Sequence, residues 1–184
     1  DEWADAEGNL GRVYGAQWRD WRGADGRRVD QIASLIEQIK KNPDSRRHIV
    51  SAWNVGEIEQ MALPPCHKTY QFHVADGVLS GLLFQRSCDL GLGFGFNVFA
   101  ASMLIRMLAQ QCCYEPGELI WQGGDVHLYL NHAELVEEQL SRTPAGDPKL
   151  HLLRKPDSIF GYEIEDFEVL DYQPQAHISA PVAV

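Results

Sequence analysis

The amino-acid sequence predicts an α+β fold in which a mixed or antiparallel sheet packs against helices, one of them central and buried. Residues 69–75 and 78–86 flank Asp76-Gly77, a dipeptide typical of the tight turn of a β-hairpin. Residues 96–111 are apolar on nearly every side, which indicates a buried helix. Strands and helices are therefore both present, in the mixture that is typical of α+β proteins.

The other predicted elements follow from the same kinds of pattern. Asp30 can cap a helix whose apolar residues recur at helical spacing, and Asn42-Pro43 ends it. The apolar residues of that helix are Ile32, Leu35, Ile36 and Ile39. We also predict strands at 48–53, 119–121, 150–153 and 162–170, and an amphipathic helix at 128–141.

The composition is that of an ordinary globular protein, with 45% hydrophobic and 23% charged residues. A chain of 184 residues is long enough to bury a core of its own, so we expect one domain over 1–184. The net charge of −10 argues against nucleic acid or an anionic membrane as a partner. No apolar run approaches the roughly 20 residues that cross a bilayer.

The four cysteines, Cys66, Cys88, Cys112 and Cys113, lack the paired spacing of a zinc site. They are also sparse for a disulfide framework, so we expect a reducing, cytoplasmic compartment and no metal. The chain begins at Asp1 rather than at a methionine, and we expect it to be a fragment or a trimmed polypeptide.

Cys66 is the strongest candidate for a catalytic residue. It lies in the run Met-Ala-Leu-Pro-Pro-Cys-His over residues 61–67. A free thiol is only slightly ionised at neutral pH, so a nucleophilic cysteine needs a cationic or hydrogen-bonding neighbourhood. Residues 85–87, Gln-Arg-Ser, offer one. The alternative is that Cys66 is a small buried hydrophobic residue, as most unpaired cysteines are.

Two groups of arginines are candidates for binding an anion. Arg46 and Arg47 follow a helix end, and guanidinium pairs bind phosphate or carboxylate, although a solvated surface pair is the commoner case. Arg86 ends a predicted strand together with Ser87 and Asp89. A charged side chain in an otherwise apolar strand needs a partner, which makes Arg86 the stronger candidate.

Three further polar residues can recognise a nucleotide. Asn97 offers both a donor and an acceptor, as the imide edge of uracil requires, unless it is a plain helix cap. His127 and Tyr129 lie two residues apart and can hydrogen-bond a sugar, unless both are core residues. The glycine-rich run at 90–96 is not a dinucleotide loop, because no βαβ unit surrounds it.

Together these blocks resemble the thymidylate synthase family, in the family's order and over essentially the whole chain. The matching blocks are residues 44–47, 51–54, 63–67, 85–89, 96–97, 124–129 and 180–184. The resemblance implies a thymidylate synthase-like fold. The start of the chain is similar to the middle of the family's polypeptide, so we expect a long N-terminal segment of the family to be absent from this sequence.

The resemblance implies methylation of dUMP at carbon 5, with 5,10-methylenetetrahydrofolate as carbon and hydride donor and Cys66 attacking carbon 6. It also implies a homodimer in which Arg46 and Arg47 reach the partner's phosphate. The implied catalytic residues are Cys66, Arg86, Asp89, Asn97 and His67. The implied dUMP-binding residues are Arg46, Arg47, Gln85, Arg86, Ser87, Asn97, His127 and Tyr129. The implied folate-binding residues are Trp3, Leu63, Asp89, Leu92, Gly93, Phe96, Tyr129, Val182 and Ala183.

The chain departs from the family pattern in the loop before Asn97. Gly95 replaces a proline, Phe94 a smaller aliphatic residue and Gly91 a bulky residue. Because glycine relaxes the backbone, a deoxyuridylate 5-hydroxymethyltransferase, in which water replaces hydride, is the main alternative. The apolar segment at 180–184 argues against it, since that segment is expected to exclude water. A non-catalytic nucleotide- or RNA-binding relative is a further alternative.

Overall fold

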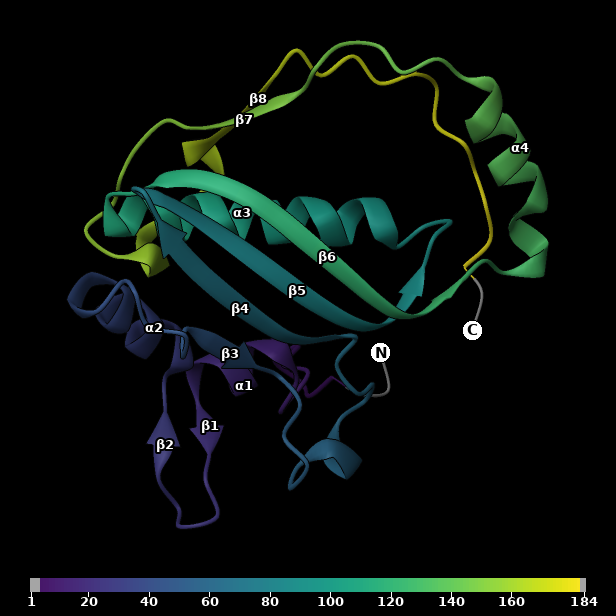
Figure 1. Cartoon of the computed structure of the whole chain (residues 1–184). Coiled ribbons are helices and arrows are strands. Elements are labelled where there is room, and N and C mark those ends of the chain that lie inside the picture. The colour runs from purple at the N-terminus through teal and green to yellow at the C-terminus, as the bar shows by residue number, and fades with distance from the viewer. Residues whose placement is uncertain (1–3, 183–184) are drawn as a thin grey trace.

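In the computed structural model, which describes residues 4–182, a four-stranded sheet forms the centre of the molecule (Figure 1). Its strands are β3 (Ile49–Ser51), β4 (His67–Ala75), β5 (Val78–Asp89) and β6 (Glu115–His127), in that order. The pairs β3–β4 and β4–β5 are antiparallel, whereas β5 and β6 are parallel. The sheet is therefore mixed, as the sequence predicted.

The hairpin between β4 and β5 has the predicted turn. Asp76 and Gly77 both adopt positive φ angles, of 50° and 79°. Two successive residues in this region form the turn whose twist matches that of the paired strands. The register that follows places His73 opposite Ser80 and His67 opposite Gln85. The start of β4 therefore lies beside the end of β5.

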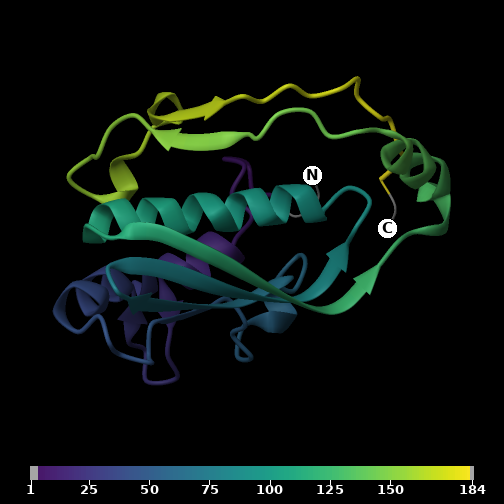
Figure 2. The same ribbon diagram turned by 45° about the horizontal axis from the view of Figure 1, so that its top comes forward.

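Helix α3 (Phe94–Cys112) lies against one face of the sheet (Figure 2). A Cβ at Gly81 of β5 would come within 2.8 Å of Ile105, so this strand position needs glycine for α3 to approach. The helix is central, as predicted, but its burial is one-sided among the described residues. Phe96 is 78% exposed, because the sheet covers only one face of the helix. The buried apolar positions are Ala101, Ile105, Leu108, Ala109 and Cys112.

Before the sheet, residues 14–41 form α1 (Tyr14–Arg19), a small hairpin of β1 (Trp21–Arg22) and β2 (Arg28–Val29), and α2 (Gln31–Lys41). The Asp30 side chain accepts a hydrogen bond of 2.9 Å from the Ala33 N–H, which confirms the predicted cap. The helix ends before Asn42-Pro43, as predicted, and it buries Ile32, Leu35 and Ile39.

Strand β6 has 13 residues, far more than the predicted strand at 119–121. Most of this strand was not predicted, because proline and glycine usually disfavour strands and it contains Pro116, Gly117, Gly123 and Gly124. Here Gly124 is needed for close pairing, since a Cβ there would lie 2.9 Å from the Arg86 carbonyl oxygen of β5.

The last third wraps around the far side of α3 (Figures 1 and 2). The helix predicted at 128–141 is a turn of 3₁₀ helix at Leu130–His132 followed by α4 (Ala133–Ser141). Strands β7 (Lys149–Leu152) and β8 (Phe167–Leu170) pair antiparallel. The strand predicted at 162–170 is shorter because a 3₁₀ turn at Ile164–Asp166 precedes β8. From 4 to 182, the structure contains no helix that is both long and apolar enough to cross a membrane.

Candidate active site

A cavity of about 580 Å³ opens where three strand ends meet. The antiparallel pairing places the start of β4 beside the end of β5, and the parallel pairing places Asp89 of β5 beside His127 of β6. Residues far apart in sequence therefore line one cavity. They are Tyr14, Trp18, Leu63, Cys66, His67, Gln85, Arg86, Ser87, Asp89, Gly93, Asn97, His127 and Tyr129.

The loop that carries Cys66 is held by Arg86. The guanidinium Nη2 donates a hydrogen bond of 2.7 Å to the Pro64 carbonyl, and Nε donates one of 3.0 Å to the Pro65 carbonyl. The Arg86 backbone N–H also donates to the Cys66 carbonyl at 2.9 Å. The half-buried thiol of Cys66 therefore has a fixed guanidinium beside its own peptide.

Tyr14 holds the same loop from the opposite side, a role that the sequence did not predict. Its hydroxyl accepts hydrogen bonds from the N–H of Cys66 at 2.6 Å and from the N–H of His67 at 3.2 Å. Burial raises the pKa of this phenol, so it stays protonated and retains a hydroxyl proton for a further acceptor. Trp18, one turn further along α1, was also missed and lines the same wall. Their spacing of four residues was the available signal.

Asn97 is oriented by Gln85. The buried Gln85 amide donates through Nε2 to the Asn97 Oδ1 at 2.6 Å and to the Ser87 carbonyl at 3.0 Å. Its Oε1 accepts from the indole N–H of Trp121 at 2.9 Å. Because an indole N–H only donates, this contact fixes which end of the Gln85 amide is oxygen. Asn97 consequently keeps its Nδ2 donors for a ligand.

Burial lowers the pKa of His67, so its imidazole is neutral at pH 7, although a hydrogen bond with Asn97 acts in the opposite direction.

His127 and Tyr129 form an edge-to-face pair with ring centroids 5.1 Å apart, and both line the cavity. Asp89 accepts hydrogen bonds from the backbone N–H groups of Gly91, at 2.8 Å, and Leu92, at 3.3 Å. The carboxylate thereby shapes the glycine-rich loop before α3.

Some predicted site residues do not line the cavity in the single chain. Arg46 and Arg47 lie exposed in the turn between α2 and β3. Leu92 is half-buried outside the lining, and Phe96 and Val182 are 78% and 80% exposed. Trp3 and Ala183 lie outside the described residues.

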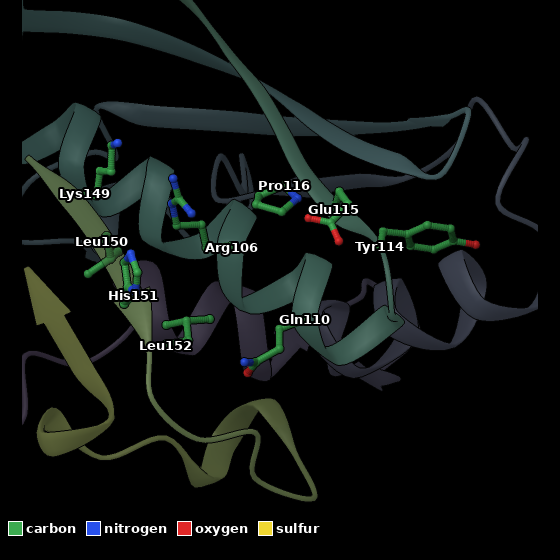
Figure 3. Close-up of a pocket in the computed structure, with 9 residues that line it drawn as sticks. All are labelled: Arg106, Gln110, Tyr114, Glu115, Pro116, Lys149, Leu150, His151 and Leu152. Carbon is green, nitrogen blue, oxygen red and sulfur yellow. The ribbon is translucent and has the colours of Figure 1, made fainter. Parts of the chain in front are cut away.

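A second cavity, of about 400 Å³, lies between the C-terminal half of α3 and β7 (Figure 3). Arg106 of α3 and Lys149 and His151 of β7 line it, with Glu115 at the start of β6. None of the predicted site residues belongs to it. Among residues 4–182, no three His, Cys, Asp or Glu side chains are grouped so that they could hold a metal ion.

The fold and the cavity thus define an α+β protein in which a thiol, a guanidinium and an asparagine amide line one cavity. A family model described as thymidylate synthase matches residues 1–184. The chain belongs to the thymidylate synthase family.

Two curated relatives carry the name thymidylate synthase. The relative from Novosphingobium aromaticivorans is 62% identical over 187 residues, which cover 96% of this chain and 60% of the relative. The relative from Sphingopyxis alaskensis is 62% identical over 188 residues, with the same shares. The chain therefore spans about 60% of the length of the curated relatives that it matches.

Proposed function

We propose that this protein converts dUMP to dTMP, with 5,10-methylenetetrahydrofolate as the donor of both the carbon and the hydride. The observation that carries the proposal is that Cys66, Arg86 and Asn97 line one cavity, within a chain of this family. A pyrimidine carbon is unreactive toward an electrophile until a covalent nucleophile makes the ring electron-rich. This reaction needs a thiol nucleophile, a cation and an amide that hydrogen-bonds the imide edge of uracil. In this chain we assign these roles to Cys66, Arg86 and Asn97.

In this proposal, the Cys66 thiolate adds to carbon 6 of the uracil, so that carbon 5 becomes nucleophilic. The negative charge spreads onto the uracil O4, where a donor must stabilise it. Asn97 Nδ2 is the candidate donor, since Gln85 already occupies its oxygen. Arg86 and Ser87 bind the phosphate, and His127 and Tyr129 bind the ribose. Carbon 5 would then bond to the folate methylene carbon and lose its proton, and the bond from that carbon to tetrahydrofolate would break. A hydride from tetrahydrofolate would reduce the methylene carbon as the Cys66 thiolate departs, which gives dTMP and dihydrofolate.

The remaining lining residues fit a flat heteroaromatic cosubstrate such as a folate. Leu63, Trp18 and Tyr129 present apolar and ring surfaces to the cavity, and Asp89 presents a carboxylate that accepts N–H donors. The bound methylenetetrahydrofolate would supply one carbon and one hydride. Gly93 lies in the same lining, while Leu92, Phe96 and Val182 remain candidates at its rim.

The thiol adduct is the direct test. Incubation with 5-fluoro-dUMP and methylenetetrahydrofolate is expected to leave a covalent adduct on the peptide that contains Cys66, as detected by mass spectrometry. Cys66→Ala should abolish the adduct, and Cys113→Ser is the matched control because Cys113 is an exposed free thiol. Nucleotide binding without an adduct in the unmodified protein would instead favour the non-catalytic relative.

Product analysis separates the synthase from the hydroxymethyltransferase. The synthase gives equal amounts of dTMP and dihydrofolate. Addition of water would give hydroxymethyl-dUMP and tetrahydrofolate, with no dihydrofolate. The observation that keeps this alternative open is Gly95, where an added Cβ would meet no atom within 4 Å. We favour the synthase because the apolar C-terminal residues can exclude water.

We also propose a homodimer, in the cytoplasm, in which Arg46 and Arg47 reach the partner's cavity. Ile49 of β3 and Ile120 of β6 are 48% and 51% exposed on the sheet face opposite α3. Exposed apolar residues on a sheet face mark an interaction surface. Ile49, on this face, follows Arg47 by two residues, so the two arginines lie next to the proposed interface. Mixing inactive Cys66→Ser with inactive Arg46→Ala/Arg47→Ala protein should restore activity through mixed dimers. If the mixture stays inactive although sedimentation shows dimers, the arginines do not act across the interface.

A further inference from the structure

His132 is buried at the end of the short 3₁₀ turn that follows β6, and it contacts the C-terminal segment. Its Nε2 lies 2.8 Å from the carbonyl oxygen of Pro181. A carbonyl only accepts hydrogen bonds, so Nε2 must carry the proton and donate it. The contact thus fixes the tautomer of the imidazole and ties it to the backbone of the segment 49 residues further along the chain.

The other ring nitrogen faces the cavity's carboxylate. Nδ1 of His132 is buried without a hydrogen-bond partner among the described residues, and it lies 3.8 Å from Oδ1 of Asp89. The Tyr129 ring packs edge-to-face on the imidazole, with centroids 5.6 Å apart. Asp89 and Tyr129 both line the candidate active site. His132 therefore lies directly behind two residues of the site without lining the cavity itself.

Gly91 leaves room for this arrangement. A Cβ at Gly91 would come within 2.6 Å of Nδ1 of His132, so any larger residue would displace the ring or the loop. Asp89 holds the same loop through the Gly91 N–H. Gly91, which replaces a bulky residue of the family pattern, is therefore the loop residue that packs on His132.

The C-terminal segment runs back beside α4, as Figures 1 and 2 show. Gln175 Nε2 donates to the Thr143 carbonyl at 2.7 Å, and Arg142 donates to the Ala176 carbonyl. The bond from His132 to Pro181 is the last side-chain hydrogen bond along the segment among the described residues. It therefore holds the part of the segment that is nearest to the site.

We propose that His132 is a positioning residue that holds the C-terminal segment against the Asp89 loop through its Nε2–H. The inference rests on the proposed function, since it assigns to that segment the closing of the folate side of the cavity. Without the bond, the segment leaves the Asp89 loop more often. Folate then binds more weakly, and water reaches the site. The dUMP side does not depend on the bond, because Arg86, Ser87 and Asn97 make no hydrogen bond with His132 or Pro181 in the structure. Tyr129 contacts the His132 ring rather than the Nε2–Pro181 bond.

Three substitutions separate the two ring nitrogens. His132→Phe removes both nitrogens but keeps a ring for Tyr129, whereas His132→Gln keeps an N–H donor near the position of Nε2. His132→Asn places its polar atoms near Nδ1 only. We expect Phe and Asn to raise the KM for methylenetetrahydrofolate about tenfold, as loss of one buried hydrogen bond allows. The Kd for dUMP should stay within twofold in His132→Phe, which keeps the ring against Tyr129, and His132→Gln should restore the folate KM to within threefold.

Hydrogen–deuterium exchange of residues 174–182 is the readout that does not require activity. Exchange should rise in His132→Phe and stay near the unmodified level in His132→Gln. The matched control is His177→Phe, because His177 is exposed on the same segment. Unchanged exchange in His132→Phe, or an equal rise in His177→Phe, would overturn the proposal.

A truncation after Ala180 removes the acceptor carbonyl and closes a double-mutant cycle. In the truncated protein, His132→Phe should change folate affinity by less than twofold, since the partner is already gone. A further tenfold loss would mean that His132 acts in another way and would overturn the proposal. Failure of the 5-fluoro-dUMP adduct in the unmodified protein would refute the proposed function instead. The exchange measurement would still decide whether His132 holds the segment.

Discussion

The side-chain amide of Gln85 donates a hydrogen bond of 2.6 Å to Oδ1 of Asn97, and this contact sets the orientation of the residue that we propose to face the base. Gln85 lies on β5 and Asn97 in the first turn of α3, so the sheet and the central helix together position one amide. Gln85 lines the cavity, and its hydrogen bonds to Asn97, Ser87 and Trp121 hold the Asn97 amide in place.

We therefore expect Gln85→Leu to lower kcat/KM for dUMP by about 10- to 100-fold, since a lost positioning hydrogen bond in a buried site costs about 1–3 kcal/mol.

Asn97→Asp is expected to shift preference toward dCMP, because a carboxylate can pair with the cytosine amino group. Steady-state kinetics with both nucleotides measure this. Retention of full dUMP selectivity in Asn97→Asp would show that another group reads the base.

Tyr14 yields a third prediction. Tyr14→Phe removes the acceptor of two backbone N–H groups, those of Cys66 and His67. We expect kcat to fall by at least tenfold and the rate of 5-fluoro-dUMP adduct formation to fall with it, because the thiol is no longer held in place. Tyr172→Phe is the control, since Tyr172 is 63% exposed. A Tyr14→Phe enzyme that forms the adduct at the normal rate would contradict a positioning role.

Elements that depend on neighbouring residues were predictable from the sequence. The Asp30 cap, the apolar spacing of α2 and the Asp76-Gly77 turn each depend on contacts within a few residues. Elements that depend on distant contacts were not. Strand β6 pairs in parallel with β5 and needs glycine at 124 for that pairing, so its local sequence argued against a strand.

The candidate site follows the same rule. Cys66, Arg86 and Asn97 were predictable because their residue types match a chemistry and a family pattern. Tyr14 was not, because its contact with Cys66 joins residues 52 positions apart. His132 was missed for the same reason, since its partners Asp89 and Pro181 come from two distant segments.

The acid stability of the protein should depend on His67. Burial lowers the pKa of His67 below its usual value of 6.5, so the folded state prefers the neutral ring. Stability from this group is therefore complete above pH 6.5 and falls as the pH drops below it, because the unfolded chain takes up the proton first. We expect His67→Gln to flatten this decline in urea unfolding between pH 7 and pH 5. His73→Gln, at an exposed position of the same strand, should leave the slope unchanged.

A network centred on Arg12 should control the stability of the segment that leads to Cys66. The Arg12 guanidinium donates to both oxygens of Glu57, at 3.0–3.1 Å, and to Asp20 at 2.9 Å. The buried Gln17 amide donates to the same Glu57 carboxylate at 2.7 Å. Burial alone would raise the pKa of Glu57, but the hydrogen bonds from Arg12 and Gln17 lower it below its usual value. The carboxylate is thus ionised and dependent on its partners.

Arg12→Ala leaves that carboxylate buried with its main cation removed, and we expect a loss of about 3 kcal/mol in the free energy of unfolding. The loss should be largest above pH 4.5, the usual pKa of a glutamate, and should shrink as the pH falls and Glu57 becomes protonated in both states. Arg19→Ala is the matched control, because Arg19 is 45% exposed and its ion pair with Asp30 should contribute less than about 1 kcal/mol. Equal losses in the two variants, measured by urea unfolding at pH 7, would mean that the Arg12 network contributes no more than a surface ion pair.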